Sequence, residues 1–186
     1  MSLYKKSMAD LHRAIPGANT QEKMPVIVVL EDIRSGLNIG SVFRTADAFN
    51  VEEIILAGYS VAPPHREILK TALDATLSVK WSQTLVLEAR LKELKNNGYK
   101  IAAVEQVEGS IYLQDFKSVD YLPLVLLFGN EVHGVSDQTL SLCDFGIEVP
   151  QSGIKHSLNI AVCAGVVLWQ CYQQISISNY TKSKIL

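Results

Sequence analysis

Polar side chains gather in two glycine-containing loops in the C-terminal third of the chain. Each loop follows a short apolar run of strand length and precedes a segment with a helical pattern. Their polar residues are Asn130, Glu131, Lys155, His156, Ser157 and Asn159. In a loop that connects a buried strand to a helix, the free N–H groups at the helix N-terminus can bind a polar small molecule or a phosphate. The two loops therefore predict a ligand site.

An arginine lies far upstream in an otherwise apolar stretch, Val42-Phe43-Arg44-Thr45-Ala46. Its helix is expected over residues 38–49, with Asn38 as the N-cap. A guanidinium can bind a phosphate or carboxylate through two hydrogen bonds. Alternatively, Arg44 packs its stem on the core and extends its head to a carboxylate. Taken alone, Glu131, Ser157 and Asn159 also have structural explanations as helix-terminal or loop-capping residues, so only their joint placement favours a ligand role.

Apolar runs of strand length alternate with helical patterns along the chain, which predicts an α/β fold. We expect strands over residues 26–30, 53–57, 99–104, 124–128 and 145–149, and helices over 38–49, 66–75, 85–96, 110–116, 136–142 and 157–172. Most of the strands lack polar alternation, which indicates a parallel-sheet core with helices on both faces. Ligands of such sheets bind beyond the carboxyl ends of the strands, here in the loops 31–38, 129–136 and 150–157.

The chain has 186 residues, which favours a single domain over residues 25–175. Residues 1–24 are expected to form an N-terminal helical extension and residues 176–186 a polar tail. The three cysteines form no C-x-x-C pair, so reduced thiols are expected. There is no signal-peptide pattern and no apolar run of membrane-spanning length, so we expect a cytoplasmic protein without a membrane.

The net charge is -2, so any nucleic-acid site must consist of locally clustered cations. Several common chemistries lack their motifs. The sequence contains no G-x-G-x-x-G after the first strand, no phosphate loop ending in Gly-Lys-Ser/Thr and no G-x-S-x-G elbow. Its four histidines have no zinc spacing, so no metal is expected.

Three stretches of the sequence resemble the three motifs of the SpoU (TrmH-type) RNA methyltransferases, of the SPOUT superfamily. They are Asn38-x-Gly40-x-x-x-Arg44-Thr45-Ala46, Phe128-Gly129-Asn130-Glu131-x-x-Gly134-Val135-Ser136 and Val149-Pro150-x-x-Gly153-x-x-x-Ser157-Leu158-Asn159-Ile160-Ala161-Val162. Between them, the segment containing Pro63-Pro64-His65, Lys70-Thr71-Ala72-Leu73 and Trp81 is also similar to that family. The likeness runs in order from about Val26 to Tyr172.

The resemblance implies an enzyme that transfers a methyl group from S-adenosylmethionine to a ribose 2′-hydroxyl in tRNA or rRNA, with tRNA slightly favoured. It also implies a C-terminal trefoil knot, a rare exception to unknotted topology, and a homodimer with the active site near the subunit interface. Neither the knot nor the dimer follows from the spacing of residues.

The resemblance also implies a role for individual residues. Those implied to bind the cofactor are Gly129, Val149 and Leu158, together with Asn130, Gly134 and Gly153. Those implied to act near the reacting ribose are Asn38, Arg44, Glu131, Ser157 and Asn159. Contacts to RNA are expected from Arg34, Arg44, Lys155 and His156.

Two other functions remain open on the sequence. One is a catalytically inactive RNA-binding protein of the same fold, against which the intact polar residues of the motifs argue. The other is an enzyme with a different nucleotide ligand, which the missing phosphate-loop motifs disfavour. The chain departs from the family at Asp74, where the family tends to have glycine.

Overall fold

The computed structural model describes residues 4–7, 10, 22–155 and 157–183, with side chains described as far as residue 176. The extension expected over residues 1–24 lies mostly outside these ranges, and so does His156. Within the described residues, no helix is both long and apolar enough to cross a membrane.

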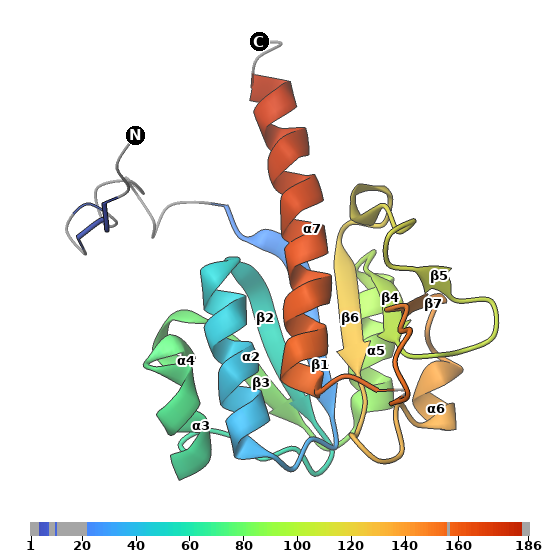
Figure 1. Cartoon of the computed structure of the whole chain (residues 1–186). Helices are drawn as coiled ribbons and strands as arrows, with labels where there is room; N and C mark the ends of the chain where they lie inside the picture. Colours follow the sequence, from blue (N-terminus) through green and yellow to red (C-terminus); the bar gives the residue numbers. More distant parts are fainter. Residues whose placement is uncertain (1–3, 8–9, 11–21, 156, 184–186) are drawn as a thin grey trace.

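Seven parallel strands form one sheet in the order β3-β2-β1-β6-β4-β7-β5 (Figure 1). Their bounds are β1 Met24–Glu31, β2 Val51–Ala57, β3 Trp81–Thr84, β4 Lys100–Val104, β5 Ile111–Tyr112, β6 Leu124–Phe128 and β7 Phe145–Glu148. At the centre, β1 pairs with β2 and with β6, and β4 pairs with β6 and with β7. Residues far apart in the sequence therefore meet at one edge of the sheet, beyond the strand ends.

Helices cover both faces of this sheet, as the sequence predicts. One face carries α2 (Gly36–Ala48), α3 (Arg66–Ala72), α4 (Ala75–Ser78) and α7 (Ile160–Ser183), and the other carries α5 (Leu87–Asn96) (Figure 1). A short turn of 3-10 helix, η1 (Ser118–Asp120), contacts α7, and α6 (Asp137–Leu140) precedes β7.

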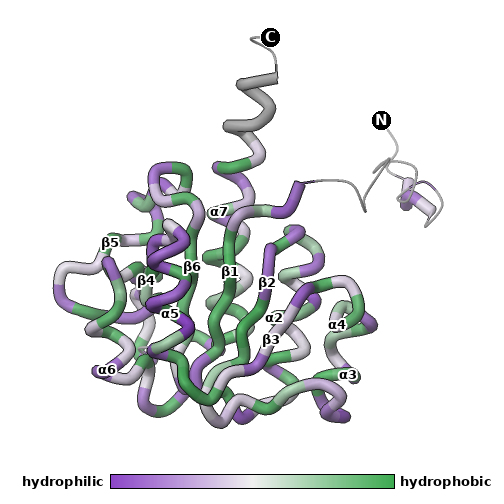
Figure 2. The backbone as a smooth tube through the Cα atoms, turned by 180° about the vertical axis from the view of Figure 1, so that it is seen from behind, coloured by the Kyte–Doolittle hydropathy of each residue, from purple (hydrophilic) through white to green (hydrophobic). Residues whose placement is uncertain are grey.

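The core explains why the strands show no polar alternation. Val26, Val28 and Leu30 of β1 pack toward α2 and α7, whereas Ile27 and Val29 pack toward α5. Figure 2 shows β1 and β6 as largely hydrophobic along their length. Because both faces are covered, both sets of side chains are buried, and each fully buried Val, Leu or Ile contributes about 1.5–3 kcal/mol.

Several elements differ from those expected. The sequence did not indicate β3, whose residues Trp-Ser-Gln-Thr lack an apolar run, and residues 111–112 form the edge strand β5 instead of a helix. The helix expected over 66–75 ends at Ala72 because Leu73 and Asp74 adopt positive φ angles of 46° and 66°. The glycine that the family tends to have at residue 74 suits this left-handed conformation. Helix α7 continues to Ser183, with no Gly or Pro after residue 165 to end it.

Candidate active site

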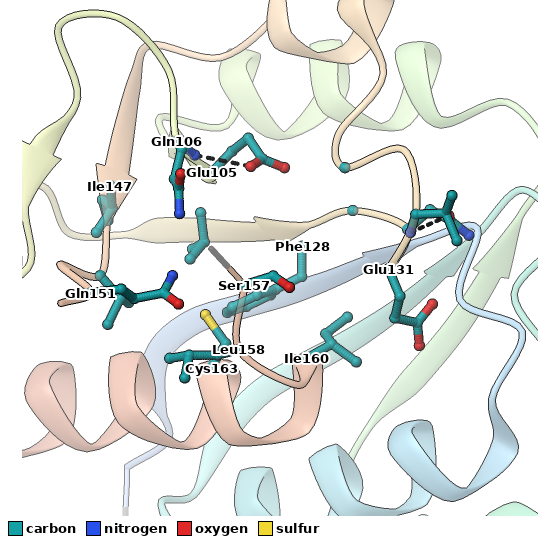
Figure 3. A pocket seen from close by; sticks show the side chains of 16 residues that line it. Glu105, Gln106, Phe128, Glu131, Ile147, Gln151, Ser157, Leu158, Ile160 and Cys163 are labelled. Carbon is teal, nitrogen blue, oxygen red and sulfur yellow. Dashed lines mark hydrogen bonds between the residues drawn. The ribbon is translucent and has the colours of Figure 1, made fainter. Parts of the chain in front are cut away.

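A cavity of about 240 Å³ opens beyond the carboxyl ends of β4, β6 and β7 (Figure 3). Three loops and the start of α7 enclose it. The lining residues are Val104, Glu105, Gln106, Phe128, Gly129, Asn130, Glu131, Val132, Gly134, Ile147, Val149, Gln151, Ser157, Leu158, Ile160 and Cys163. The lining is apolar on the strand side and polar at the loops, as in sites that bind a small organic ligand.

The loop after β6 is folded tightly against itself. The backbones of Asn130 and Gly134 exchange two hydrogen bonds, of 3.0 and 2.8 Å. A Cβ on Gly129 would collide with the backbone of Gly134 and Val135. Gly134 has a φ of +68°, and a Cβ there would collide with the Glu105 carboxylate. Gly129 is therefore required by the close approach of two backbone segments, and Gly134 by its left-handed conformation.

Asn130 uses both ends of its side chain to shape the same loop. Its Nδ2 donates to the carbonyl of Asp32, at 2.9 Å, and its Oδ1 accepts from the N–H groups of Val132 and His133. The side chain thereby ties the loop after β6 to the loop after β1. Asn130 lines the cavity, and its amide already has these protein partners.

Three polar residues from different elements form a hydrogen-bonded chain at the cavity. Asn38 Nδ2 donates to Glu131 Oε1 at 2.9 Å, and Asn159 Nδ2 donates to Asn38 Oδ1 at 3.1 Å. The Oδ1 atom of Asn159 accepts from Ala161 N at 2.9 Å and so caps α7. Among the described residues, Glu131 has no ion pair, so its carboxylate is held by Asn38 without being neutralised.

Two further carboxylates bind the loop that follows β6. Glu105 Oε2 accepts from Val135 N at 3.2 Å, and Glu105 Oε1 accepts from Gln106 N at 2.9 Å. Glu31, buried at the end of β1, accepts from Ser136 Oγ at 2.9 Å and from Thr139 Oγ1 at 2.6 Å. These contacts fix the loop to strands β1 and β4.

Cys163 on α7 is the thiol that lines the cavity. Burial, reinforced by the negative charge of Glu105, raises its pKa to about 11. The thiol is therefore protonated at neutral pH and is a poor nucleophile. In the described part of the chain, no group of three His, Cys, Asp or Glu side chains could hold a metal ion.

Most of the residues singled out in the sequence meet at this cavity. Those that line it are Gly129, Asn130, Glu131, Gly134, Val149, Ser157 and Leu158, and Asn38 and Asn159 adjoin it through their hydrogen bonds. Gly153 and Lys155 line a shallow hollow formed by residues 150–155 and 157–158. Arg34 is exposed in the loop after β1, and Arg44 lines another hollow between α2 and α3.

Sequence reasoning missed Glu105, Gln106, Gln151 and Cys163 as lining residues. The first two follow directly after β4, whose end at Val104 matches the expected end of that strand. Because ligands of parallel sheets bind beyond the carboxyl ends of the strands, the loop after β4 could also have been predicted to line the site. Gln151 lies in a loop that was singled out, whereas Cys163 gave no signal because an apolar helix commonly contains a buried cysteine.

The SpoU rRNA Methylase family model matches residues 25–169. The chain therefore belongs to this family, and the resemblance of its three motifs is confirmed.

Curated relatives agree with this assignment. The chain is 28% identical over 166 residues to a Staphylococcus haemolyticus protein assigned to the TrmH family of tRNA/rRNA methyltransferases, covering 89% of this chain and 66% of the relative. It is 29% identical over 157 residues to the 23S rRNA (guanosine-2′-O-)-methyltransferase RlmB of Ralstonia nicotianae, covering 84% and 61%. The chain thus spans less than two thirds of the length of these relatives.

Solved structures share the fold. The TrmH/SpoU tRNA modifying enzyme of A. aeolicus superimposes with a TM-score of 0.78 at 23% identity, covering 87% of this chain and 81% of that one. A structure described as concerning the 2-OH methylation of C/U34 on tRNA has a TM-score of 0.72 at 25% identity, covering 81% of this chain and 96% of that one.

Proposed function

We propose that this protein is an RNA 2′-O-methyltransferase that uses S-adenosylmethionine. The observation that carries the proposal is the convergence of the second and third motif segments on one cavity, to which Asn38 of the first motif is joined by the hydrogen-bonded chain Asn159–Asn38–Glu131. The same polar residues argue against the inactive RNA-binding alternative.

The cavity lining fits this cofactor in polarity and charge. Apolar side chains such as Phe128, Ile147 and Leu158 suit an adenosine ring. Glu105 and Glu131 place negative charge beside a ligand that carries a positive sulfur. When bound, S-adenosylmethionine supplies an activated methyl group with a good leaving group. The residues of the loops, Gly129 and Val149 among them, would bind and orient it mainly through their backbone.

The protein must then chiefly align the ribose hydroxyl, because orientation alone can remove about 7–11 kcal/mol from a barrier. Asn38 and Asn159 hold each other and Glu131 in fixed positions, so Glu131 presents an oriented carboxylate oxygen to the ribose. Ser157, at the edge of the cavity, offers a hydroxyl to the substrate. Lys155 and Arg34, both exposed, are available to contact RNA phosphates beside it, and His156 is proposed to do the same.

Arg44 is proposed to hold the phosphate next to the target ribose and to polarise the hydroxyl. A guanidinium stays protonated at ordinary pH, so it is a poor general base, and the proton would pass to phosphate or water. Within its own chain Arg44 lines a hollow separate from the cofactor cavity. We propose that it serves the cavity of a second subunit.

A homodimer would bring Arg44 of one subunit to the cofactor cavity of the other. Among its described side chains, helix α7 exposes Val162, Val166, Trp169 and Tyr172, large apolar residues at helical spacing. An exposed apolar stripe of this kind commonly marks a protein interface. Phe49, which lines the hollow of Arg44, packs against Trp169 and Tyr172, so the stripe continues to that hollow.

We also propose that residues 25–175 form one methyltransferase domain, between an N-terminal extension over residues 1–24 and a tail over residues 176–186. The C-terminal part of this domain is proposed to contain a trefoil knot. The knot is supported by membership of the family, whose resemblance implies it. The proposed compartment is the cytoplasm, in keeping with RNA substrates.

Methyl transfer from labelled S-adenosylmethionine to total tRNA and total rRNA tests the function. We expect label in RNA, with tRNA favoured, at a nucleotide whose 3′ linkage resists alkali because its 2′-hydroxyl is blocked. Arg44→Ala should abolish the transfer and leave the thermal unfolding temperature unchanged. Binding of RNA and cofactor without any transfer would support the inactive alternative, and calorimetry without cofactor binding would contradict the proposal.

A further inference from the structure

The hollow that contains Arg44 has a composition of its own. It measures about 560 Å³ and lies between α2 and α3, apart from the cofactor cavity. The described residues that line it are Ser41, Arg44, Thr45, Ala48, Phe49, Lys70, Thr71 and Leu73. They include two cations, Arg44 and Lys70, and no carboxylate.

Both cations are available to a ligand. Neither forms an ion pair with another described residue. Asp47, one turn after Arg44, accepts a hydrogen bond from Ser78 on α4 and does not line the hollow. The positive charge of Arg44 and Lys70 is therefore not compensated inside the hollow, which favours an anion.

The hydroxyl groups of the lining already donate to backbone carbonyls. Ser41 Oγ and Thr71 Oγ1 both donate to the carbonyl of Leu37, at 2.9 and 3.0 Å, and Thr45 Oγ1 donates to Ser41 O at 3.1 Å. Hydrogen-bond donors for an anion must therefore come from Arg44 and Lys70. Because the donors belong to these two side chains, the hollow favours an anion large enough to reach both, such as a phosphate diester.

An apolar floor lies beside the two cations. It consists of Ala48, Phe49 and Leu73. The ring of Phe49 packs against Tyr172 and Trp169, with centroids 5.1 and 5.9 Å apart, which fixes its orientation. Cations next to a rigid apolar or aromatic surface are typical of sites that bind one strand of RNA, with phosphate on the cations and sugar or base on the floor.

We propose that this α2–α3 hollow binds a backbone phosphate of the RNA substrate close to the methylated nucleotide, with Lys70 as a phosphate ligand alongside Arg44. The inference rests on the proposed function. It adds a residue from the segment between the motifs, whose side chain no motif assigns. Lys70 acts on substrate binding and not on the cofactor.

The test compares Lys70→Ala with Lys92→Ala in the full chain, using unfractionated tRNA and rRNA fragments as probes over a range of salt concentrations. Lys92 is a matched control because it lies on α5, on the opposite face, paired with Glu88 at 2.6 Å. Lys70→Ala should weaken RNA binding about fivefold near 0.1 M salt and reduce the slope of log K against log salt by about 0.7–0.9. Lys92→Ala and Lys70→Arg should bind like wild type, and all variants should bind S-adenosylmethionine equally.

Equal RNA binding by Lys70→Ala and Lys92→Ala would overturn the inference. So would a loss of dimers in sedimentation of Lys70→Ala, since the hollow would then be a protein interface. A wild-type protein that methylates RNA while Lys70→Ala binds RNA normally removes only this inference. A wild-type protein that neither binds RNA nor transfers methyl removes the proposed function as well.

Discussion

At the scale of single residues, the site depends on side chains whose partners come from distant parts of the chain. Asn38 was expected to cap α2, but the N-cap is Ser35, whose Oγ accepts from Asn38 N at 3.3 Å. Asn38 lies in the first turn of α2, Glu131 follows β6 and Asn159 precedes α7, yet the three share one hydrogen-bonded chain. Each residue alone has an ordinary structural explanation. Their mutual contacts are what favour a catalytic arrangement, and they give each substitution a distinct expected outcome.

Gly129→Ala should weaken S-adenosylmethionine binding by about 5- to 150-fold, since displacing packed backbone costs about 1–3 kcal/mol. The added Cβ would collide with the backbone of Gly134 and Val135. Calorimetric titration measures the change. Gly165→Ala on α7 is the matched control, because a Cβ there meets nothing within 4 Å. Equal affinities for the two variants would contradict a role for the tight loop.

Glu131→Ala and Glu131→Gln distinguish the effect of the carboxylate charge from that of the hydrogen bond to Asn38. Both remove the carboxylate charge, but Gln keeps an oxygen that can accept from Asn38 Nδ2. If Glu131 orients the ribose through its charge, both variants should lower kcat by about 10²–10⁴. Single-turnover methyl transfer with saturating cofactor measures this. Near-normal kcat in Glu131→Gln would assign the residue to holding Asn38 alone.

Glu105→Gln should reduce the preference of the cavity for S-adenosylmethionine over its demethylated product. The product lacks the positive sulfur, so only the donor gains from the carboxylate. For a partly exposed charge we expect about 1 kcal/mol, or about fivefold, in the ratio of the two affinities. Titration with both ligands measures the ratio. Glu108→Gln, an exposed change outside the cavity, should leave it unchanged.

At the scale of elements, the loops after the strands are functional only if the strands hold their register. Glu53, which is buried on β2, helps to hold this register by connecting β2 to β3 and α5. It accepts from Ser82 Oγ of β3 at 2.6 Å, pairs with Lys80 Nζ at 2.8 Å and lies 3.6 Å from Arg90 Nη2 of α5. Burial by itself raises the pKa of Glu53, but these hydrogen bonds and charges together hold it below its usual value.

This lowered pKa makes part of the stability pH-dependent. The contribution of Glu53 is present above the unfolded-state pKa of about 4.3 and is lost as the pH falls through the lower folded-state pKa. Glu53→Gln should lower the free energy of unfolding at pH 7 by about 1–3 kcal/mol and remove that part of the acid dependence. Urea unfolding between pH 3 and 7 measures both, with a change at the exposed Glu108, Glu108→Gln, as control. Parallel pH profiles for wild type and Glu53→Gln would contradict the assignment.

The elements differ in how far local sequence predicts them. β1, β6 and α5 have strong apolar patterns and lie where they are expected. The edge strands β3 and β5 are short and polar or isolated, so pairing with their neighbours, β2 and β7, creates them. The break between α3 and α4 depends on the backbone conformation of Leu73 and Asp74, which residue types alone do not indicate.

At the scale of the whole molecule, Arg44 and the cofactor cavity are separate within one chain. If Arg44 acts in the cavity of a partner subunit, mixing inactive Arg44→Ala with Gly129→Ala should restore activity at a cofactor concentration too low for the weakened cavity of Gly129→Ala. A mixed dimer then combines one intact cavity with an intact Arg44, and statistical mixing should give about a quarter of wild-type activity. Activity assays on the mixture after subunit exchange measure this, whereas a mixture as inactive as its parts would place Arg44 in the cavity of its own chain.

The sequence by itself determined the parallel sheet, the loops at its carboxyl edge and the family, because these depend on local apolar patterns and on motif residues in order. Only the tertiary structure decided which side chains meet. Asn38 and Glu131 are 93 positions apart and become partners because β1 and β6 are neighbours in the sheet. Glu105 joins the cavity because β4 lies between β6 and β7, an order of strands that local patterns do not encode.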